Sequence, residues 1–123
     1  MECKKLFFKE CHLAGAKYYD LDEVFQYLRV GTELKLVHDK GNPHDENAVA
    51  VMYTKIGVEG EQEDFHIGYL PQAQNFEVSS LLQMGWGNVF KCTIVRIDPE
   101  AYYENQIRLK ISIRKNVESV AQA

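Results

Sequence analysis

The chain has 123 residues, of which 46% are hydrophobic and 26% charged, and its 14 basic and 18 acidic side chains give a formal net charge of −4. This composition is typical of one soluble globular domain, and no apolar run approaches the roughly 20 residues that a membrane span needs. The negative net charge argues against a protein that coats long nucleic acid by neutralising many phosphates. Any contact with nucleic acid must therefore be local.

The cysteines and the N-terminus bear on the compartment. Cys3, Cys11 and Cys92 have no paired spacing, which predicts free, buried thiols and neither a disulfide framework nor a zinc motif. Charged residues interrupt the apolar run that begins at Leu6, so the N-terminus does not read as a signal peptide. We therefore expect a cytoplasmic protein in a reducing environment.

The first third of the chain predicts a strand followed by a short helix. Residues 6–13 mix aromatic and apolar side chains and form the expected strand. Asp20 or Asp22 can cap the helix, and Gly31 can close it. Its apolar positions are spaced at i, i+3, i+4 and i+7 and are Leu21, Val24, Phe25 and Leu28.

Two predicted strands flank a polar loop. Residues 32–37 alternate charged and apolar side chains, and residues 48–53 have the β-branched and aromatic content of a buried strand. In the loop between them, Pro43 fixes its own φ angle, and short polar side chains can bond nearby backbone N–H groups. We therefore expect the paired strands to hold up one rigid polar cluster, made of Asn42, His44, Asp45 and Asn47.

The next segment predicts a hairpin and a longer helix. Residues 57–64 lack periodicity and predict a loose acidic loop, a solvated surface without functional weight. A strand over residues 65–70 follows, in which Gly68 predicts a bulge or a close approach by another backbone. Pro71 can begin a helix that runs to about Met84. Its expected apolar positions are Phe76, Leu81, Leu82 and Met84.

Residues 89–97 and 107–114 predict two long strands, the second with an aliphatic side chain at every odd position. The connection between them presents Tyr102 and Tyr103, which could stack on bases but are also ordinary loop residues. No acid occurs between Ile107 and Asn116, so the negative net charge does not exclude a basic face there. The basic residues of this segment are Arg108, Lys110, Arg114 and Lys115.

About six short strands, two helices and no βαβ alternation favour a mainly β (α+β) fold. The expected architecture is a small, partly open OB-like barrel of about six strands with two helices. A split sheet with helices on one face is the alternative. We expect residues 1–116 to form a single domain and residues 117–123 to be a frayed C-terminal tail.

Four blocks of the sequence together resemble the HIRAN domain, which is best known from the N-terminal part of helicase-like transcription factor and its fork-remodelling relatives, and which also occurs alone in bacteria. The blocks are Gly15-Ala16-Lys17-Tyr18-Tyr19, Gly31-Thr32-Glu33-Leu34-Lys35-Leu36, Asn42-Pro43-His44-Asp45-Glu46-Asn47-Ala48-Val49-Ala50-Val51 and Ile67-Gly68-Tyr69-Leu70-Pro71. The resemblance spans roughly residues 6–114. No Walker-type glycine-rich loop of a helicase motor is present, so we expect a free-standing, non-catalytic copy.

The resemblance implies an OB-like barrel that captures the 3′ end of single-stranded DNA. Tyr18 matches the family's base-stacking tyrosine, and Lys17 stands where a relative uses arginine, which keeps the charge but loses the bidentate geometry. Asp45 matches the acid that accepts the 3′-hydroxyl, and its charge would repel a terminal phosphate. Three further positions depart from the best-known pattern, where a tyrosine, a histidine and a lysine stand: His44, Tyr69 and Gln72.

The predicted DNA-binding set therefore has eight members: Lys17, Tyr18, Tyr19, Asn42, His44, Asp45, Tyr69 and Gln72. For Tyr18 and Tyr19 the plainer interpretation is packing, and for Asn42 it is turn formation beside Pro43. The resemblance implies a role in DNA repair or replication-fork processing, with a helicase or nuclease acting in trans as a candidate partner. We expect no cofactor, no metal and no membrane contact. The departures predict weaker DNA binding than in the fork-remodelling relatives.

Two other functional classes remain as alternatives. A protein-interaction module could use the same aromatic and polar loop to hold a peptide carboxylate or a partner's side chain. A small metal-dependent nuclease could use His44, Asp45 and Glu46, but consecutive residues of an extended loop point in alternating directions and no second acidic cluster is evident. Comparing single strands that end in a 3′-hydroxyl or a 3′-phosphate separates these classes.

Overall fold

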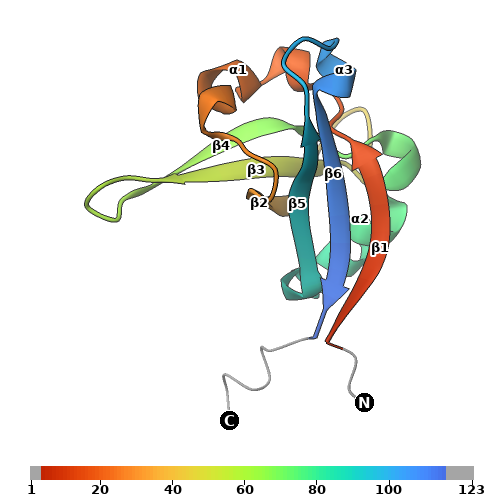
Figure 1. Ribbon diagram of the computed structural model, residues 1–123. Coiled ribbons are helices and arrows are strands. Elements are labelled where there is room, and N and C mark those ends of the chain that lie inside the picture. Colours follow the sequence, from red (N-terminus) through yellow and green to blue (C-terminus); the bar gives the residue numbers. More distant parts are fainter. Residues whose placement is uncertain (1–3, 116–123) are drawn as a thin grey trace.

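The computed structural model describes residues 4–115 and is built on a six-stranded, entirely antiparallel sheet (Figure 1). The strand order is β1-β6-β5-β2-β3-β4. The strands are β1 (Lys5–His12), β2 (Glu33–His38), β3 (Val49–Ile56), β4 (Gln62–Tyr69), β5 (Phe90–Ile97) and β6 (Ile107–Arg114). Six strands were predicted, and the mainly β, OB-like architecture is confirmed. Cys3 and the predicted tail, residues 117–123, lie outside the described residues.

The alternation of apolar and polar residues along the strands determines which side chains form the core. In β6, Ile107, Leu109 and Ile111 have at most 1% of their surface exposed, and Leu34 and Leu36 of β2 are also buried. Each fully buried side chain of this size contributes about 1.5–3 kcal/mol relative to an exposed one. The core side chains from all six strands and from the helices form one cluster, so residues 4–115 share a single hydrophobic interior.

Two cysteines belong to this core. Cys11 and Cys92 are free and buried, as the sequence predicted. Burial raises the pKa of both thiols, because an apolar surrounding disfavours the thiolate. Both side chains therefore act as small apolar core residues.

The sheet curls until its two edge strands nearly meet. Beyond the end of β1, Ala14 forms an isolated antiparallel bridge with Tyr69, the last residue of β4. The two N–H···O bonds of this bridge are each 2.8 Å long. This single bridge leaves the barrel otherwise open between β1 and β4, which agrees with the predicted partly open form.

Gly68 allows this close approach. A Cβ atom at Gly68 would lie 2.7 Å from the carbonyl oxygen of Ala14 and 2.8 Å from side-chain carbons of Leu13. The register between β3 and β4 also shifts next to Gly68, which leaves Ile67 without an opposite residue. Both features predicted for Gly68, a bulge and a close backbone approach, are therefore present.

The hairpin of β3 and β4 is longer than the sequence predicted. β4 begins at Gln62, inside the segment expected to be a loose loop, and pairs Gln62 with Ile56. Only residues 57–61 form the turn, closed by a 2.8 Å hydrogen bond from the Gly57 N–H to the Glu61 carbonyl. The expectation failed because pairing with β3 extends the strand through polar residues that carry no periodic signal. The hairpin reaches well beyond the barrel (Figure 1).

The first helical segment is shorter than predicted. It consists of the 3₁₀ turn η1 (Ala16–Tyr18), α1 (Leu21–Val24) and the 3₁₀ turn η2 (Phe25–Tyr27). Asp20 occupies the N-cap position, but its side chain makes no capping hydrogen bond, so the predicted cap is wrong in its chemistry. Gly31, at φ 95°, lies four residues beyond the helical segment and turns the chain into β2. Leu21, Val24 and Leu28 are buried as predicted.

The second helical segment, predicted as one helix from Pro71 to Met84, is divided. It contains the 3₁₀ turn η3 (Gln72–Gln74) and α2 (Phe76–Gln83), followed by the 3₁₀ turn η4 (Gly87–Val89). Of the apolar positions expected in this helix, Phe76 and Met84 are each 63% exposed, while Val78 and Ser79 are buried. The face that a helix buries depends on where it docks, and here β1 helps to set that position.

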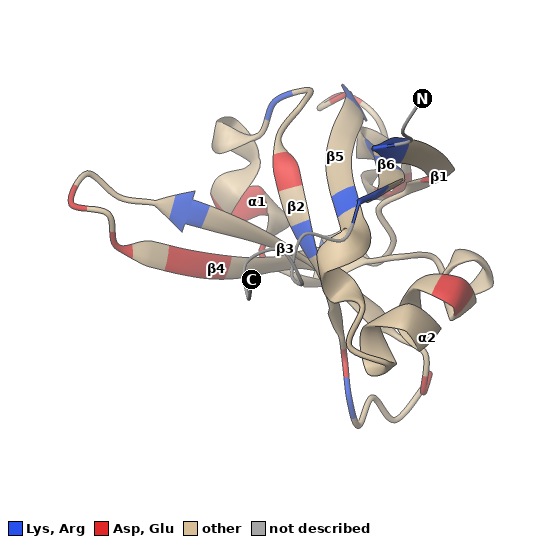
Figure 2. Cartoon of the chain, turned by 90° about the horizontal axis from the view of Figure 1, so that it is seen from below, with Lys and Arg blue, Asp and Glu red and all other residues tan. Residues whose placement is uncertain are grey.

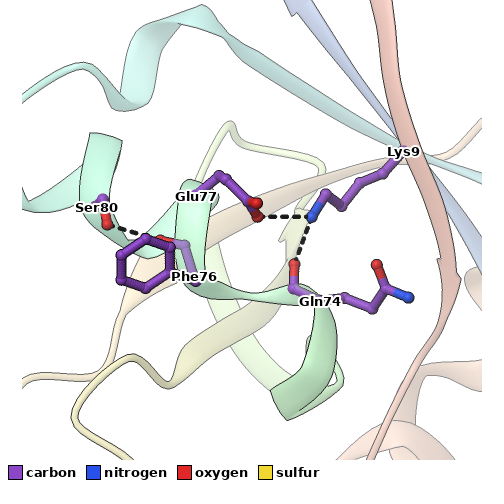
Figure 3. Close-up of polar contacts among 5 residues, drawn as sticks. All are labelled: Lys9, Gln74, Phe76, Glu77 and Ser80. Carbon is purple, nitrogen blue, oxygen red and sulfur yellow. Dashed lines mark hydrogen bonds and ion pairs between the residues drawn. The ribbon is translucent and has the colours of Figure 1, made fainter.

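The docking of α2 uses Lys9 of β1 (Figure 3). Its Nζ donates to the carbonyl oxygen of Gln74 at 2.8 Å and to Oε1 of Glu77 at 3.0 Å. Lys9 thereby ties the start of α2 to the sheet. The short helix α3 (Tyr103–Gln106), within the connection between β5 and β6, was not predicted. None of the helices in residues 4–115 has the length and apolar character that crossing a bilayer requires.

Candidate nucleic-acid interface

The loop between β2 and β3 is shaped by Asn42. Its Oδ1 accepts hydrogen bonds from the backbone N–H groups of His44 at 2.8 Å and Asp45 at 3.1 Å. Its Nδ2 donates to Oδ2 of Asp39 at 3.0 Å. Both ends of the amide are therefore engaged within the protein, which is the turn-forming arrangement that the sequence left as one of two possibilities.

The carboxylate of Asp45 is held from two sides. Its Oδ1 accepts the backbone N–H of Asn47 at 2.9 Å, and its Oδ2 accepts Nδ2 of Asn75 at 2.8 Å. Asn75 is only 3% exposed and immediately precedes α2, so the helix helps to fix the loop. An ionised carboxylate has about four acceptor sites, so these two bonds leave Asp45 able to accept another donor.

Three rings pack together beside this loop. Tyr19 stacks on His66 with 4.3 Å between ring centroids and meets Tyr69 edge-on at 5.3 Å. His66 and Tyr69 are also in edge contact at 4.7 Å. Such pairs stabilise by about 0.5–1.5 kcal/mol beyond the area that they bury. Tyr19 and Tyr69 are thus parts of a rigid wall.

The hydroxyl of Tyr69 donates a 2.5 Å hydrogen bond to Oδ2 of Asp39. Burial and this hydrogen bond raise the pKa of Tyr69, and the hydrogen bonds from Tyr69 and Asn42 lower the pKa of Asp39. The hydrogen bond between them contributes to both shifts, because it favours the neutral phenol donating to the ionised carboxylate. Asp39 therefore links the aromatic wall to the Asn42 turn.

This pair predicts how the fold responds to pH. Because the pKa of Tyr69 is raised on folding, its contribution to stability is complete below its usual value of 10.0 and is lost as the pH rises through the folded value. Asp39 has the opposite sign: its contribution is present above 3.8 and is lost at lower pH. We expect tyrosinate absorbance to show one of the seven tyrosines ionising later than the others. Asp39→Asn should shift that late transition toward pH 10, and an unchanged transition would contradict the assignment.

Two adjoining hollows collect the predicted site residues. One, of about 270 Å³, is lined by six of the eight, and the other, of about 470 Å³, is lined by the remaining two. Gly15, at φ 68°, lines both. The first contains Tyr19, Asn42, His44, Asp45, Tyr69 and Gln72. The second contains Lys17 and Tyr18 together with Tyr102 and Tyr103.

The neighbouring tyrosines are therefore separated by the fold. Tyr19 shares the hollow of Asp45, whereas Tyr18 is 76% exposed in the adjoining hollow, with Nζ of Lys17 5.8 Å from its ring centroid. Tyr102, 86% exposed, reaches the same hollow as Tyr18 from the connection between β5 and β6.

Sequence reasoning missed three residues that shape the site. Asp39 and Asn75 hold site residues that lie thirty positions away, and His66 packs against Tyr19 from β4. For Asp39, its position directly before the polar loop was a local indication that it could contribute to the site. No local pattern marks Asn75 or His66. Among residues 4–115, no three His, Cys, Asp or Glu side chains gather in a way that could hold a metal ion.

Comparisons with known proteins bear on the fold and the family. The family model described as the HIRAN domain matches residues 6–116. A crystal structure of a protein from Lactobacillus plantarum is similar with a TM-score of 0.69 and 19% identity, covering 91% of this chain and 97% of that one. The crystal structure of the HIRAN domain of human HLTF is similar with a TM-score of 0.51 and 15% identity, covering 91% and 82%. No curated protein matches the sequence.

Proposed function

This chain belongs to the HIRAN domain family, and from that premise we propose that it holds the 3′-hydroxyl end of single-stranded DNA without catalysing a reaction. HIRAN domains are known as DNA-binding modules. One observation supports the finer proposal most strongly: six of the eight residues predicted from the sequence line a single hollow around Asp45, and the other two line the hollow next to it.

Asp45 is the residue that recognises the terminal hydroxyl in this proposal. Its carboxylate is fixed by Asn47 and Asn75 and retains acceptor capacity. A 3′-hydroxyl can donate to it, and hydrogen bonds to charged groups contribute about 1.5–3 kcal/mol. A 3′-phosphate carries only acceptors and negative charge at neutral pH, so the same carboxylate repels it. One side chain thereby provides both the attraction and the discrimination.

In this proposal, Tyr18 binds the terminal base and Lys17 binds its phosphate. The exposed Tyr18 ring offers a face for stacking, whereas Tyr19 is occupied by His66 and Tyr69. Lys17, close to the Tyr18 ring, supplies a cation for the phosphate on the inner side of the terminal nucleotide. The proposed place of such an end-holder is DNA repair or replication-fork processing, beside a helicase or nuclease that acts in trans.

The proposal is tested by fluorescence anisotropy with two short strands of the same sequence, one ending in a 3′-hydroxyl and the other in a 3′-phosphate. We expect the hydroxyl end to bind more tightly. Because one or two phosphates are neutralised in the hollows, the slope of log K against log salt should be shallow, about −0.7 per phosphate. Equal affinity for the two ends would remove the proposal and leave nonspecific binding or a different ligand.

Tyr18→Ala should weaken binding of both ends by the same factor. Stacking of a base on an aromatic ring contributes about 1–3 kcal/mol, which corresponds to roughly 5- to 150-fold in Kd. Tyr18→Phe should retain most of the affinity, because it keeps the ring face. Tyr27→Ala removes another exposed tyrosine, from η2, and should leave Kd unchanged. Loss of affinity for only one of the two ends in Tyr18→Ala would contradict the stacking role.

A further inference from the structure

One face of the sheet concentrates positive charge. Residues directly opposite each other in paired strands share a face, and alternate residues of a strand share it too. The face of β1, β6, β5 and β2 opposite to the one where Lys9 meets α2 is here called the basic sheet face. Its charged members are Lys5, Lys35, Lys91, Arg96, Arg108, Lys110 and Arg114, with the two carboxylates Glu10 and Glu33.

The charge of this face contrasts with that of the molecule. Seven cations against two carboxylates give a formal balance of +5, although the whole chain has −4, so the remainder carries −9. Figure 2 shows the contrast, with basic segments on β2 and β5 and acidic ones on β4 and the turn before it. The net charge therefore conceals a strongly cationic surface.

Several of these cations have no counter-ion in the described part of the chain. Arg108 pairs with Glu10, and Arg114 lies 3.7 Å from Glu33. Within residues 4–115, the side chains of Lys91, Arg96 and Lys110 form no ion pair. These three cations lie in the two adjacent strands β5 and β6 of the basic sheet face.

The register also places like charges opposite each other. Arg96 faces Arg108 across β5 and β6, and Lys5 faces Arg114 across β1 and β6. Like charges directly opposite in a sheet are destabilising. Lys110 faces Thr93 and is thereby a diagonal neighbour of Lys91. A polyanion on this surface would relieve the repulsion.

The basic sheet face begins next to the proposed end-binding site. Ile97 and Ile107 are the last pair before the connection that carries Tyr102 and Tyr103, and Arg96 and Arg108 are the pair before that one. The hollow of Tyr18 and Tyr102 thus lies at the end of β5 and β6 where the cations start. From there, Arg108 and Lys110 follow each other along β6 at about 7 Å, two residues apart.

We propose that the basic sheet face binds the phosphate backbone of the same single strand, upstream of the nucleotide held at Asp45. This inference rests on the proposed function and extends it: the hollows recognise the end, and the sheet binds the backbone without reading sequence. A nucleic-acid strand is favoured over an anionic membrane or an acidic protein because the cations form a row that is continuous with the end-binding hollows. The β3–β4 hairpin, whose acidic segment was predicted from the sequence to be without functional weight, carries Glu59, Glu61, Glu63 and Asp64, and their negative charge would disfavour a path of the strand across it.

The test varies strand length at a constant end. Anisotropy with oligothymidines of two and ten nucleotides, both ending in a 3′-hydroxyl, is measured over a range of salt concentrations. We expect the ten-nucleotide strand to bind roughly tenfold more tightly at low salt. Its salt slope should be steeper by about 0.7 for each additional phosphate bound, roughly −2 more for three phosphates. Equal slopes for the two lengths would overturn the proposal.

Charge-reversal variants test whether the length-dependent gain in affinity arises at the basic sheet face. Lys110→Glu and Arg96→Glu should each remove most of the length-dependent gain and leave both dinucleotide binding and the 3′-hydroxyl preference unchanged. Lys55→Glu, an equal charge change on β3, should retain the gain. Arg96→Glu should also raise the thermal midpoint, because it replaces a like-charge pair with an ion pair opposite Arg108. If Lys55→Glu lost the length-dependent gain in affinity to the same extent, the gain would depend only on net charge. The assignment to the basic sheet face would then be wrong.

The outcomes separate this inference from the proposed function. A hydroxyl preference without a length effect would overturn only the inference about the sheet. A length effect without a hydroxyl preference would overturn end recognition and leave backbone binding. If anionic phosphatidylserine vesicles bind and Lys110→Glu abolishes that binding, while strand length has no effect, the surface is a membrane contact and the proposal is wrong.

Discussion

Asp45→Ala is expected to erase the preference for a 3′-hydroxyl over a 3′-phosphate and to weaken binding of the hydroxyl end by about 10- to 100-fold, the equivalent of one hydrogen bond to a charged group. The variant removes both the acceptor for the hydroxyl and the charge that repels a phosphate. Binding of the 3′-phosphate strand should therefore be unchanged or slightly tighter. Anisotropy titrations of the two strands, at one fixed salt concentration, give the four dissociation constants that are needed.

The neighbouring Glu46→Ala variant is the matched control. It removes the same charge from the same loop. Glu46 is exposed, and its backbone carbonyl accepts a hydrogen bond from His38 Nε2 at 2.9 Å. We expect it to keep the hydroxyl preference. If Glu46→Ala lost the preference as well, the discrimination would come from the charge of the loop and not from the carboxylate that Asn75 holds.

Gly68→Ala is expected to have the largest effect on stability, with a loss of about 1–3 kcal/mol in the free energy of unfolding. The added Cβ would lie 2.7 Å from the Ala14 carbonyl oxygen, which is a backbone atom held in the bridge between Ala14 and Tyr69. Relief of the clash requires the bridge to open. Urea denaturation measures the loss, and weaker binding of the hydroxyl end should accompany it because Tyr69 lines the hollow.

Gly87→Ala provides the comparison. Its Cβ would lie 3.0 Å from a terminal methyl of Leu82, a flexible side chain that can move away. We expect a clearly smaller loss of stability and unchanged DNA binding. If Gly68→Ala unfolded at the same urea concentration as the unmodified protein, the bridge would not be holding the barrel edges together.

The strands could be predicted because their signal is local. The alternation over residues 107–114 records which side chains face the core, and β6 has the predicted bounds. The loop chemistry of Asn42 was also readable, because its hydrogen-bond partners lie two and three residues away. Where neighbouring residues decide the structure, the amino-acid pattern is sufficient.

Features that depend on distant partners were not predictable in the same way. Asn75 and Asp45 are thirty residues apart, and nothing around Asn75 indicates that it holds a site residue. Phe76 is apolar yet exposed, because the docking of α2 turns Val78 toward the core instead. The division of Tyr18 and Tyr19 between two hollows likewise follows from the closure of the barrel near Gly15.

The most direct test of end recognition is an NMR titration of the ¹⁵N-labelled protein with a trinucleotide that ends in a 3′-hydroxyl. We expect the largest chemical-shift changes at the amides of His44, Asp45 and Asn47, and none at Val58 in the hairpin turn. The same trinucleotide with a 3′-phosphate should leave these amides nearly unchanged. Equal changes with both trinucleotides, or changes confined to residues away from the Asp45 hollow, would contradict recognition of the 3′-hydroxyl at Asp45.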